Sequence, residues 1–251
     1  MIDVDKHSLS GSDNYGWEED KPRLVLYADF MGFKSLVENK SHSDLKQELD
    51  DFRILFKNRI KQFCGDENFR YAQFSDSILL VVNGVEEKMF KLLTSAAFCL
   101  MHVAMESRFP LKGAIAQGIF TYDKAKELYL GKPLVDAYLL HEQVKYYGIV
   151  VHNSAEQTVK NFSTRSLPYL NTKINIERGV VSHYHLCWNL LNENLEEANY
   201  TKQCKVWLEK ISQQVSGFPR IYIDNTLEIF ERDRGNVESL PNDRSNAVVV
   251  R

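Results

Sequence analysis

The chain has 251 residues, of which 44% are hydrophobic and 26% are charged, and its formal net charge is -3. This size and hydrophobic content predict one large globular domain with a buried core. The slight negative charge, with acidic and basic residues interspersed, excludes a broad basic surface and argues against nucleic acid as a partner.

The chain ends and the cysteines bear on where the protein works. The N-terminal stretch has no apolar core of a signal peptide, and the best apolar run, around His102, is too short to span a bilayer. We therefore expect no membrane association. The polar composition of residues 1–21 and 233–251 predicts two flexible tails. The four cysteines lack CxxC spacing, which predicts reduced core thiols in a cytoplasmic protein: Cys64, Cys99, Cys187 and Cys204.

The first half of the folded unit shows alternating strand and helix patterns. Residues 23–29 form an apolar run that predicts a buried strand ending at Asp29. Apolar residues then recur every three or four positions from Leu45 to Phe63, which predicts a helix with Ser43 as its N-cap. Two short apolar runs around Asp76, within residues 69–84, predict a β-hairpin.

The pattern continues with a helix over about 86–106 and a strand over 111–123. The order is βαββαβ, which predicts an α+β fold of the ferredoxin-like type. We expect a main domain over residues 22–190 and a helical extension over 191–232. In that extension, Gly217-Phe218-Pro219 separates two helices.

The predicted sheet places the end of the first strand beside the central hairpin, so Asp29 and Asp76 should be neighbours. Two carboxylates in an apolar setting repel each other unless one is protonated or a divalent cation lies between them. A magnesium site is the economical interpretation. The backbone of Phe30, Met31, Gly32 and Phe33 enters a helix with free N–H groups, which is typical of a phosphate cradle. Metal and cradle together suggest a nucleoside triphosphate.

Other interpretations of these residues stay open. Asp29 is also compatible with a helix N-cap or with a phosphoacceptor of the response-regulator type, and Asp76 with a simple turn residue. A haloacid phosphatase would have a second aspartate two residues after Asp29, where Met31 stands. Lys112 and Lys132 are candidates for binding the triphosphate, although such lysines are often merely solvated.

Four segments in this order resemble class III nucleotidyl cyclases. "YADFMGFKSLV" is similar to the first metal motif, with Asp29 in the metal position and Phe30 offering its carbonyl to the metal. "YAQFSDSILLVV" resembles the second metal motif, with Asp76 as the carboxylate and Ser75 where glycine is usual. "LKGAIAQG" and "YLGKPLVDAYLLHEQVKYYGIVVHNSA" resemble the segments that follow. The resemblance covers about residues 22–190.

The departures from that family narrow the expected substrate. The family's transition-state asparagine and arginine fall at about Val135 and Leu139, and its purine-reading residues fall at about Ala72 and Leu128. With the neighbouring Tyr71, this combination resembles the bacterial pyrimidine cyclases of anti-phage defence, the Pycsar systems. We expect Tyr71, Ala72 and Leu128 to form the nucleobase pocket.

The resemblance implies conversion of UTP or CTP to cyclic UMP or cyclic CMP and pyrophosphate. It implies two Mg²⁺ or Mn²⁺ ions per site, a head-to-tail homodimer with shared sites, and a separate effector protein that reads the product. The sequence does not separate UTP from CTP. Two alternatives remain: a purine cyclase with an altered pocket, and a non-catalytic nucleotide-binding module of the same fold.

Overall fold

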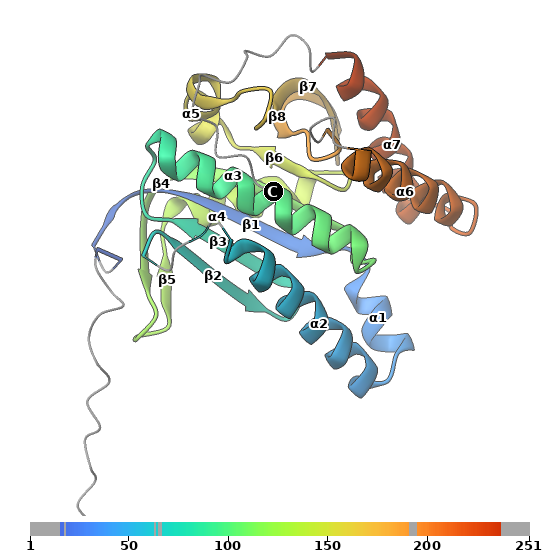
Figure 1. Ribbon diagram of the computed structural model, residues 1–251, viewed down its shortest axis with the longest axis horizontal. Helices are drawn as coiled ribbons and strands as arrows, with labels where there is room; N and C mark the ends of the chain where they lie inside the picture. The colour runs from blue at the N-terminus through green and yellow to red at the C-terminus, as the bar shows by residue number, and fades with distance from the viewer. Residues whose placement is uncertain (1–15, 18, 63, 65–66, 191–194, 237–251) are drawn as a thin grey trace, which may run out of the picture.

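The computed structural model describes residues 16–17, 19–62, 64, 67–190 and 195–236 (Figure 1). The strands are β1 (Lys21–Phe30), β2 (Phe69–Phe74), β3 (Ser77–Val82), β4 (Leu111–Asp123), β5 (Leu128–Leu130), β6 (Ile149–Val151), β7 (Tyr169–Ile176) and β8 (Gly179–Leu186). The helices are α1 (Phe33–Asn39), α2 (His42–Ile60), α3 (Glu87–Glu106), α4 (Lys132–Gln143), α5 (Asn153–Phe162), α6 (Leu195–Ser212) and α7 (Phe218–Asn236).

The strands form one eight-stranded sheet in the order β2-β3-β1-β4-β6-β8-β7, with β5 paired to β4 as a hairpin arm. Within it, β1, α2, β2, β3, α3 and β4 make the predicted ferredoxin-like βαββαβ unit, so the expected α+β fold is confirmed. Strand β4 covers the predicted residues 111–123 without a shift.

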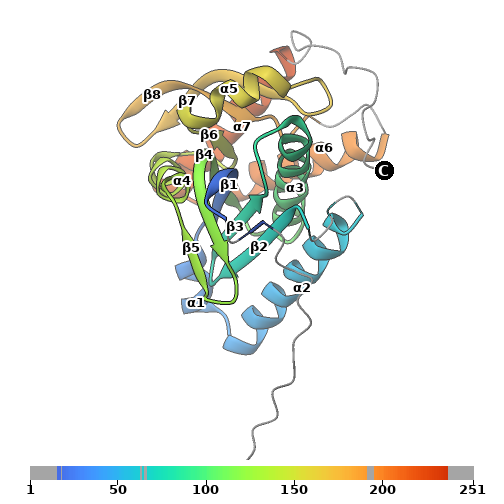
Figure 2. The ribbon, with the colours of Figure 1, turned by 90° about the vertical axis from the view of Figure 1, so that its left-hand side faces the viewer.

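The sheet has two covered faces. Alternate residues of β1 from Leu24 to Phe30 face the main core, which α2 and α3 complete. Helix α4 lies on the other face, where Ala137 and Leu140 pack against Ala114, and Figure 2 shows α3 and α4 on opposite sides of β1.

Helix α3 is long and apolar enough to cross a membrane by length and composition, and 72% of its apolar window is buried within this fold.

The N-cap of helix α2 lies two residues earlier than predicted. Its N-cap is Ser41, whose hydroxyl accepts a hydrogen bond from the Asp44 N–H at 3.1 Å. Ser43 lies inside the helix instead. Both serines precede the apolar repeat, and the repeat alone does not decide between them, since helix ends are set by a local hydrogen bond.

The described residues begin at Gly16, within the predicted N-terminal tail. Trp17 is buried and its ring packs edge-on against Tyr122 at 5.7 Å. Arg23, also buried, donates to the backbone carbonyls of Glu19 and Gly16. The polar composition of this segment did not predict that it packs against the fold. The Arg23 guanidinium is satisfied by backbone oxygens, which a sequence pattern does not reveal. Residues 1–15 of that predicted tail lie outside the described residues.

The C-terminal extension consists of the two predicted helices, α6 and α7, which lie together beside the sheet in Figure 1. Helix α7 starts at Phe218, and it packs Phe230 edge-on against Trp188 at 4.9 Å. It continues to Asn236, past the predicted end of the extension at residue 232, and residues 237–251 of the predicted tail lie outside the described residues.

Candidate functional site

Asp29 lies at the centre of a row of polar side chains that crosses three strands. The strand register places Ser77 of β3 opposite it on one side and Lys112 of β4 opposite it on the other. Opposed residues of antiparallel strands point to the same face. This face is the one that carries α4, away from α2 and α3.

The β2–β3 hairpin brings Asp76 to the end of β1, as the sequence predicts. The backbone N–H of Phe30 donates to the Asp76 carbonyl at 3.1 Å, which ties the turn to the strand end. Ser75, the other turn residue, has a left-handed backbone with φ of 57°. Asp76 is half-buried and close enough to act on Asp29 electrostatically.

The Asp29 carboxyl is held in an environment that opposes its charge. Burial, and then the charge of Asp76, raise its pKa to about 6. The Ser77 hydroxyl donates to Asp29 Oδ1 at 3.2 Å, which works in the opposite direction. Lys112 also lowers the pKa of Asp29, but burial lowers the pKa of Lys112 itself to about 8. Desolvation of both groups therefore outweighs their mutual attraction.

The Lys112 ammonium is occupied within the fold. It is 6% exposed, and it donates to the carbonyls of Glu142 at 3.2 Å and Val144 at 3.5 Å, at the C-terminal end of α4. Lysines at this end of a helix also interact favourably with its dipole. The predicted contact of Lys112 with phosphate thus competes with two hydrogen bonds, and its evident effect is on the charge of Asp29.

Three aromatic side chains that the sequence analysis missed lie beside Asp29. Tyr27 packs edge-on against His141 at 4.7 Å and against Tyr138 at 5.5 Å, and its hydroxyl is 2.7 Å from Ser77 Oγ. Tyr27 is two residues before Asp29 in the same strand, a spacing that places both on one face. That spacing could have identified Tyr27 from the sequence. Tyr138 and His141 come to the site only because α4 packs against this face of the sheet.

The predicted phosphate-binding residues are only partly available. The Met31 N–H donates to the Pro110 carbonyl at 2.7 Å, so the prediction that it is free for phosphate is wrong. Gly32 has φ of 76°, is exposed, and precedes α1, whose first residue is Phe33. Lys132 pairs with Asp136 at 2.7 Å one helical turn later.

The three predicted nucleobase residues do not share a pocket. Tyr71 faces the main core, where its ring packs against Phe56 at 5.3 Å, on the side of the sheet opposite Asp29. The prediction for Tyr71 is therefore corrected: it is a packing residue. Ala72 faces the same side as Asp29. Leu128 lies in the β4–β5 arm opposite Asp123, beyond the other end of β1, so one chain does not bring it to Asp29.

The residues at the end of β1 fit a hard divalent cation. Two half-buried carboxylates lie close enough there to act on each other, and one of them has a raised pKa. Carboxylate and carbonyl oxygens are the ligands that Mg²⁺ and Mn²⁺ prefer. A cation would offset the burial and the repulsion by Asp76 that together raise the pKa of Asp29. Asp29 and Asp76 would hold it, with the Phe30 carbonyl adjacent in the chain.

The raised pKa of Asp29 predicts how stability depends on pH without metal. The folded form keeps the Asp29 proton up to about pH 6, whereas the unfolded chain loses it near 3.8, so the stability of the wild type falls as pH rises through this window. A shift of this size corresponds to about 3 kcal/mol, and solvent screening at this half-buried carboxyl reduces the expected loss to about 1 to 2 kcal/mol. We expect Asp29→Asn to be more stable than the wild type at pH 8 and to show no advantage at pH 4.

Urea unfolding in the presence of a chelator, at both pH values, measures this difference. Adding Mn²⁺ at pH 8 should stabilise the wild type and leave Asp29→Asn unchanged. Equal stability of the two proteins at pH 8 would show that the carboxyl is not strained in the folded state.

Solved structures of cyclase domains match this chain, although no protein-family model and no curated protein does. The catalytic core of a rhodopsin-guanylyl cyclase with converted specificity, in complex with ATPαS, matches with a TM-score of 0.52 and 13% identity, over 66% of this chain and 96% of that one. The guanylate cyclase domain of RhGC from Catenaria anguillulae, in complex with GTP, matches with a TM-score of 0.50 and 13% identity, over 66% and 95%.

A third match is the non-canonical dimeric guanylyl cyclase domain of the RhoGC fusion protein from the aquatic fungus Blastocladiella emersonii. Its TM-score is 0.51 at 12% identity, over 66% of this chain and 94% of that one. At these identities the likeness concerns the fold alone. The chain has the fold of class III adenylyl and guanylyl cyclase catalytic domains.

Proposed function

We propose that this protein is a nucleotide cyclase that converts a pyrimidine nucleoside triphosphate, UTP or CTP, to its 3′,5′-cyclic monophosphate and pyrophosphate. The observation that carries the proposal is the pair of Asp29 and Asp76 at the end of β1, within a cyclase-like fold. Its product would act as a signal that a separate effector protein reads, as the resemblance to anti-phage defence cyclases implies.

Two Mg²⁺ or Mn²⁺ ions, when bound, would lower the pKa of the ribose 3′-hydroxyl and neutralise charge on the triphosphate. Asp29 and Asp76 would bind them, and Ser77 would orient the Asp29 carboxylate through its hydrogen bond. Lys112 would keep Asp29 ionised when the site is filled, since its charge lowers the pKa of Asp29. The N–H groups of Gly32 and Phe33 would contact the phosphates. Lys132 would do so only after leaving Asp136.

The proposal of a pyrimidine substrate depends on what stands at the purine-reading positions. Ala72 and Leu128 offer no hydrogen-bonding side chain to a purine edge. A site that lacks such a partner leaves polar atoms of the base unpaired, which is a strong means of rejection. Val135 and Leu139, at the usual asparagine and arginine positions, favour the second candidate, a nucleotide-binding module without turnover.

A shared site between two copies of the chain is part of the proposal. Leu128 and Asp29 lie at opposite ends of β1, so a second chain is needed to bring an arm to the metal residues. Exposed apolar side chains gather on the arm and on α4, and they would be covered in such a dimer: Ile119, Leu128, Leu130, Val135, Tyr138 and Leu139. Large exposed apolar patches typically mark interaction surfaces.

Incubation with ATP, GTP, CTP and UTP separately, each with Mn²⁺, tests the function by mass spectrometry of the products. We expect a cyclic pyrimidine monophosphate and pyrophosphate, with a preference over purines of about 10-fold or more. Cyclic AMP or GMP as the main product would establish the purine alternative. Nucleotide binding without any product, in protein that is folded and dimeric, would establish the binding module.

A further inference from the structure

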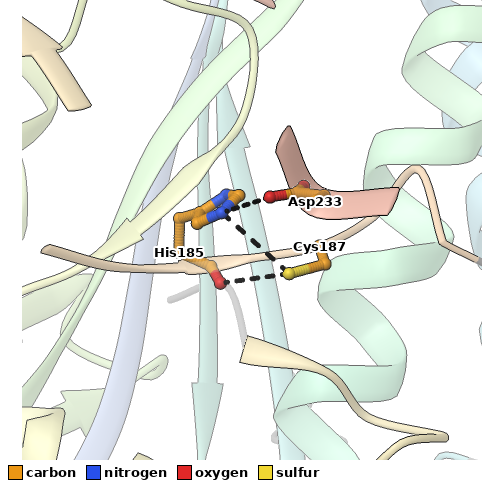
Figure 3. Close-up of side chains that lie close together, drawn as sticks. All are labelled: His185, Cys187 and Asp233. Carbon is orange, nitrogen blue, oxygen red and sulfur yellow. Dashed lines mark hydrogen bonds and ion pairs between the residues drawn. The ribbon is translucent and has the colours of Figure 1, made fainter. Parts of the chain in front are cut away.

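Three potential metal ligands meet between β8 and α7, far from the carboxylates at the end of β1. His185 lies in β8, Cys187 follows that strand, and Asp233 comes from the last turns of α7 (Figure 3). His185 Nε2 is 3.0 Å from Asp233 Oδ1 and 4.0 Å from Cys187 Sγ. One donor atom from each residue lies within 4.8 Å of the other two.

The three side chains are buried, but their polar atoms are poorly satisfied. The His185 and Asp233 side chains are each 1% exposed, and Cys187 is fully buried. Among the described residues, neither oxygen of Asp233 has an aligned hydrogen-bond donor, despite the close approach of His185 Nε2. Buried carboxylates normally have such partners. The Cys187 thiol donates to the His185 carbonyl at 3.9 Å and lies within hydrogen-bond reach of His185 Nε2, whereas the Asp233 oxygens lack an aligned donor although both groups lie close to them.

A fourth buried polar group stands beside them. Tyr146 is 1% exposed, its ring is 6.1 Å from the His185 ring, and its hydroxyl has no hydrogen-bond partner within the described part of the chain. The ring occupies the space over Gly148, where an added Cβ would lie 2.2 Å from it. The lack of a side chain at Gly148 thus leaves space for the buried Tyr146 ring.

We propose that His185, Cys187 and Asp233 bind a structural zinc ion. Imidazole, thiolate and carboxylate form a mixed donor set that suits zinc, whereas Mg²⁺ prefers oxygen ligands alone. In tetrahedral geometry, zinc–ligand bonds of about 2.0 to 2.3 Å place ligand atoms about 3.3 to 3.6 Å apart. The observed 3.0 and 4.0 Å bracket that range. Structural zinc takes four ligands, and water or the Tyr146 hydroxyl would fill the fourth position.

Charge balance supports the same assignment. Zinc binding would release the proton of the Cys187 thiol to solvent, and the resulting thiolate and the carboxylate together would carry two negative charges. One zinc ion makes the cluster neutral with a neutral imidazole. His185 and Cys187, two residues apart at a strand end, supply ligands from one element, and Asp233 supplies the third from another. The ion would therefore fasten α7 to the sheet.

This site is separate from the proposed catalytic one. Strands β4 and β6 lie between β1 and β8, so His185 is three strand spacings, or about 14 Å, across the sheet from Asp29. The inference does not depend on cyclase activity, since it concerns residues that the reaction does not use.

The full chain, purified through a tag without histidines and with no added metal, tests the proposal by elemental analysis. We expect about one zinc per chain in the wild type and in Asp29→Asn, and less than about a tenth of that in Cys187→Ala. Cys204→Ala removes another buried cysteine, from α6, and should retain the zinc. Exchange of zinc for Co²⁺ should give a thiolate-to-cobalt charge-transfer band in the wild type and in Cys204→Ala.

Measurements on the wild type keep the test decisive if Cys187→Ala does not fold. Removing zinc with a strong chelator should lower Tm, and adding zinc back should restore it. The proposal is overturned if metal-free wild type does not respond to zinc, or if the cobalt form has no thiolate band. Zinc retained by folded Cys187→Ala, or lost equally from Cys204→Ala, would also overturn it.

Discussion

Asp29→Asn and Asp76→Asn should each lower product formation by about 10³-fold or more, which corresponds to about 4 kcal/mol of transition-state stabilisation. The amide keeps the size of the side chain but loses the negative charge that would hold a divalent cation. Asp29 has Ser77 and Lys112 opposite it on either side. Steady-state kinetics with Mn²⁺ and the preferred triphosphate measures the effect.

Asp51→Asn, on the exposed surface of α2, is the matched control and should keep full activity. Circular dichroism and urea unfolding should show that both site variants are folded. An active Asp29→Asn protein would remove Asp29 from the metal site and leave its strained carboxyl without an explanation. If Asp76→Asn stayed active while Asp29→Asn did not, Asp29 would be the only carboxylate that the metal site requires.

Leu139→Lys should abolish both dimer formation and activity if two chains share each site. Leu139 is 52% exposed on α4, within the apolar patch assigned to the partner. A lysine there would be buried against apolar groups in the dimer, weakening association by about 100-fold or more. Ile54→Lys on α2, where Ile54 is 55% exposed, is the control and should change neither property. Light scattering across a concentration series measures the oligomeric state.

Mixing two inactive chains gives a second measurement of the same claim. Asp29→Asn damages the metal half of a site, and Leu128→Arg damages the arm half. In a head-to-tail dimer of the two variants, one of the two sites is intact, so an equal mixture should regain about a quarter of wild-type activity. Lys112 is unsuitable for this pairing, because it lies in the same half as Asp29. No recovery after demonstrated subunit exchange would mean that each chain works alone.

Local patterns in the sequence were sufficient to predict the central fold. Period-two and period-3.6 repeats gave β1 to β4 with α2 and α3, and their order placed Asp76 beside Asp29. The repeats did not predict which face of β2 Tyr71 occupies, because aromatic and polar residues alternate there without a clear apolar side. Tyr71 therefore looked available to a ligand although it packs on Phe56.

Contacts between distant segments could not be predicted in this way. His185 and Cys187 are close in sequence, but Asp233 joins them only when α7 docks, and it came from a segment that looked like a tail. The apolar run containing Cys187 indicated an ordinary core thiol. Similarly, the hydrogen bonds from Lys112 to the end of α4 depend on a helix that returns across the opposite face of the sheet.

The left-handed backbone of Ser75 has a consequence for the motion of the hairpin that carries Asp76. A serine with φ of 57° costs about 1 kcal/mol relative to glycine, since its Cβ is crowded in that conformation. Glycine would remove this cost but would also widen the range of conformations that the turn samples. With serine, the loop has fewer alternative shapes to visit. Ser75 thus lowers the stability of the fold slightly, and it leaves Asp76 with less positional freedom before any ligand binds.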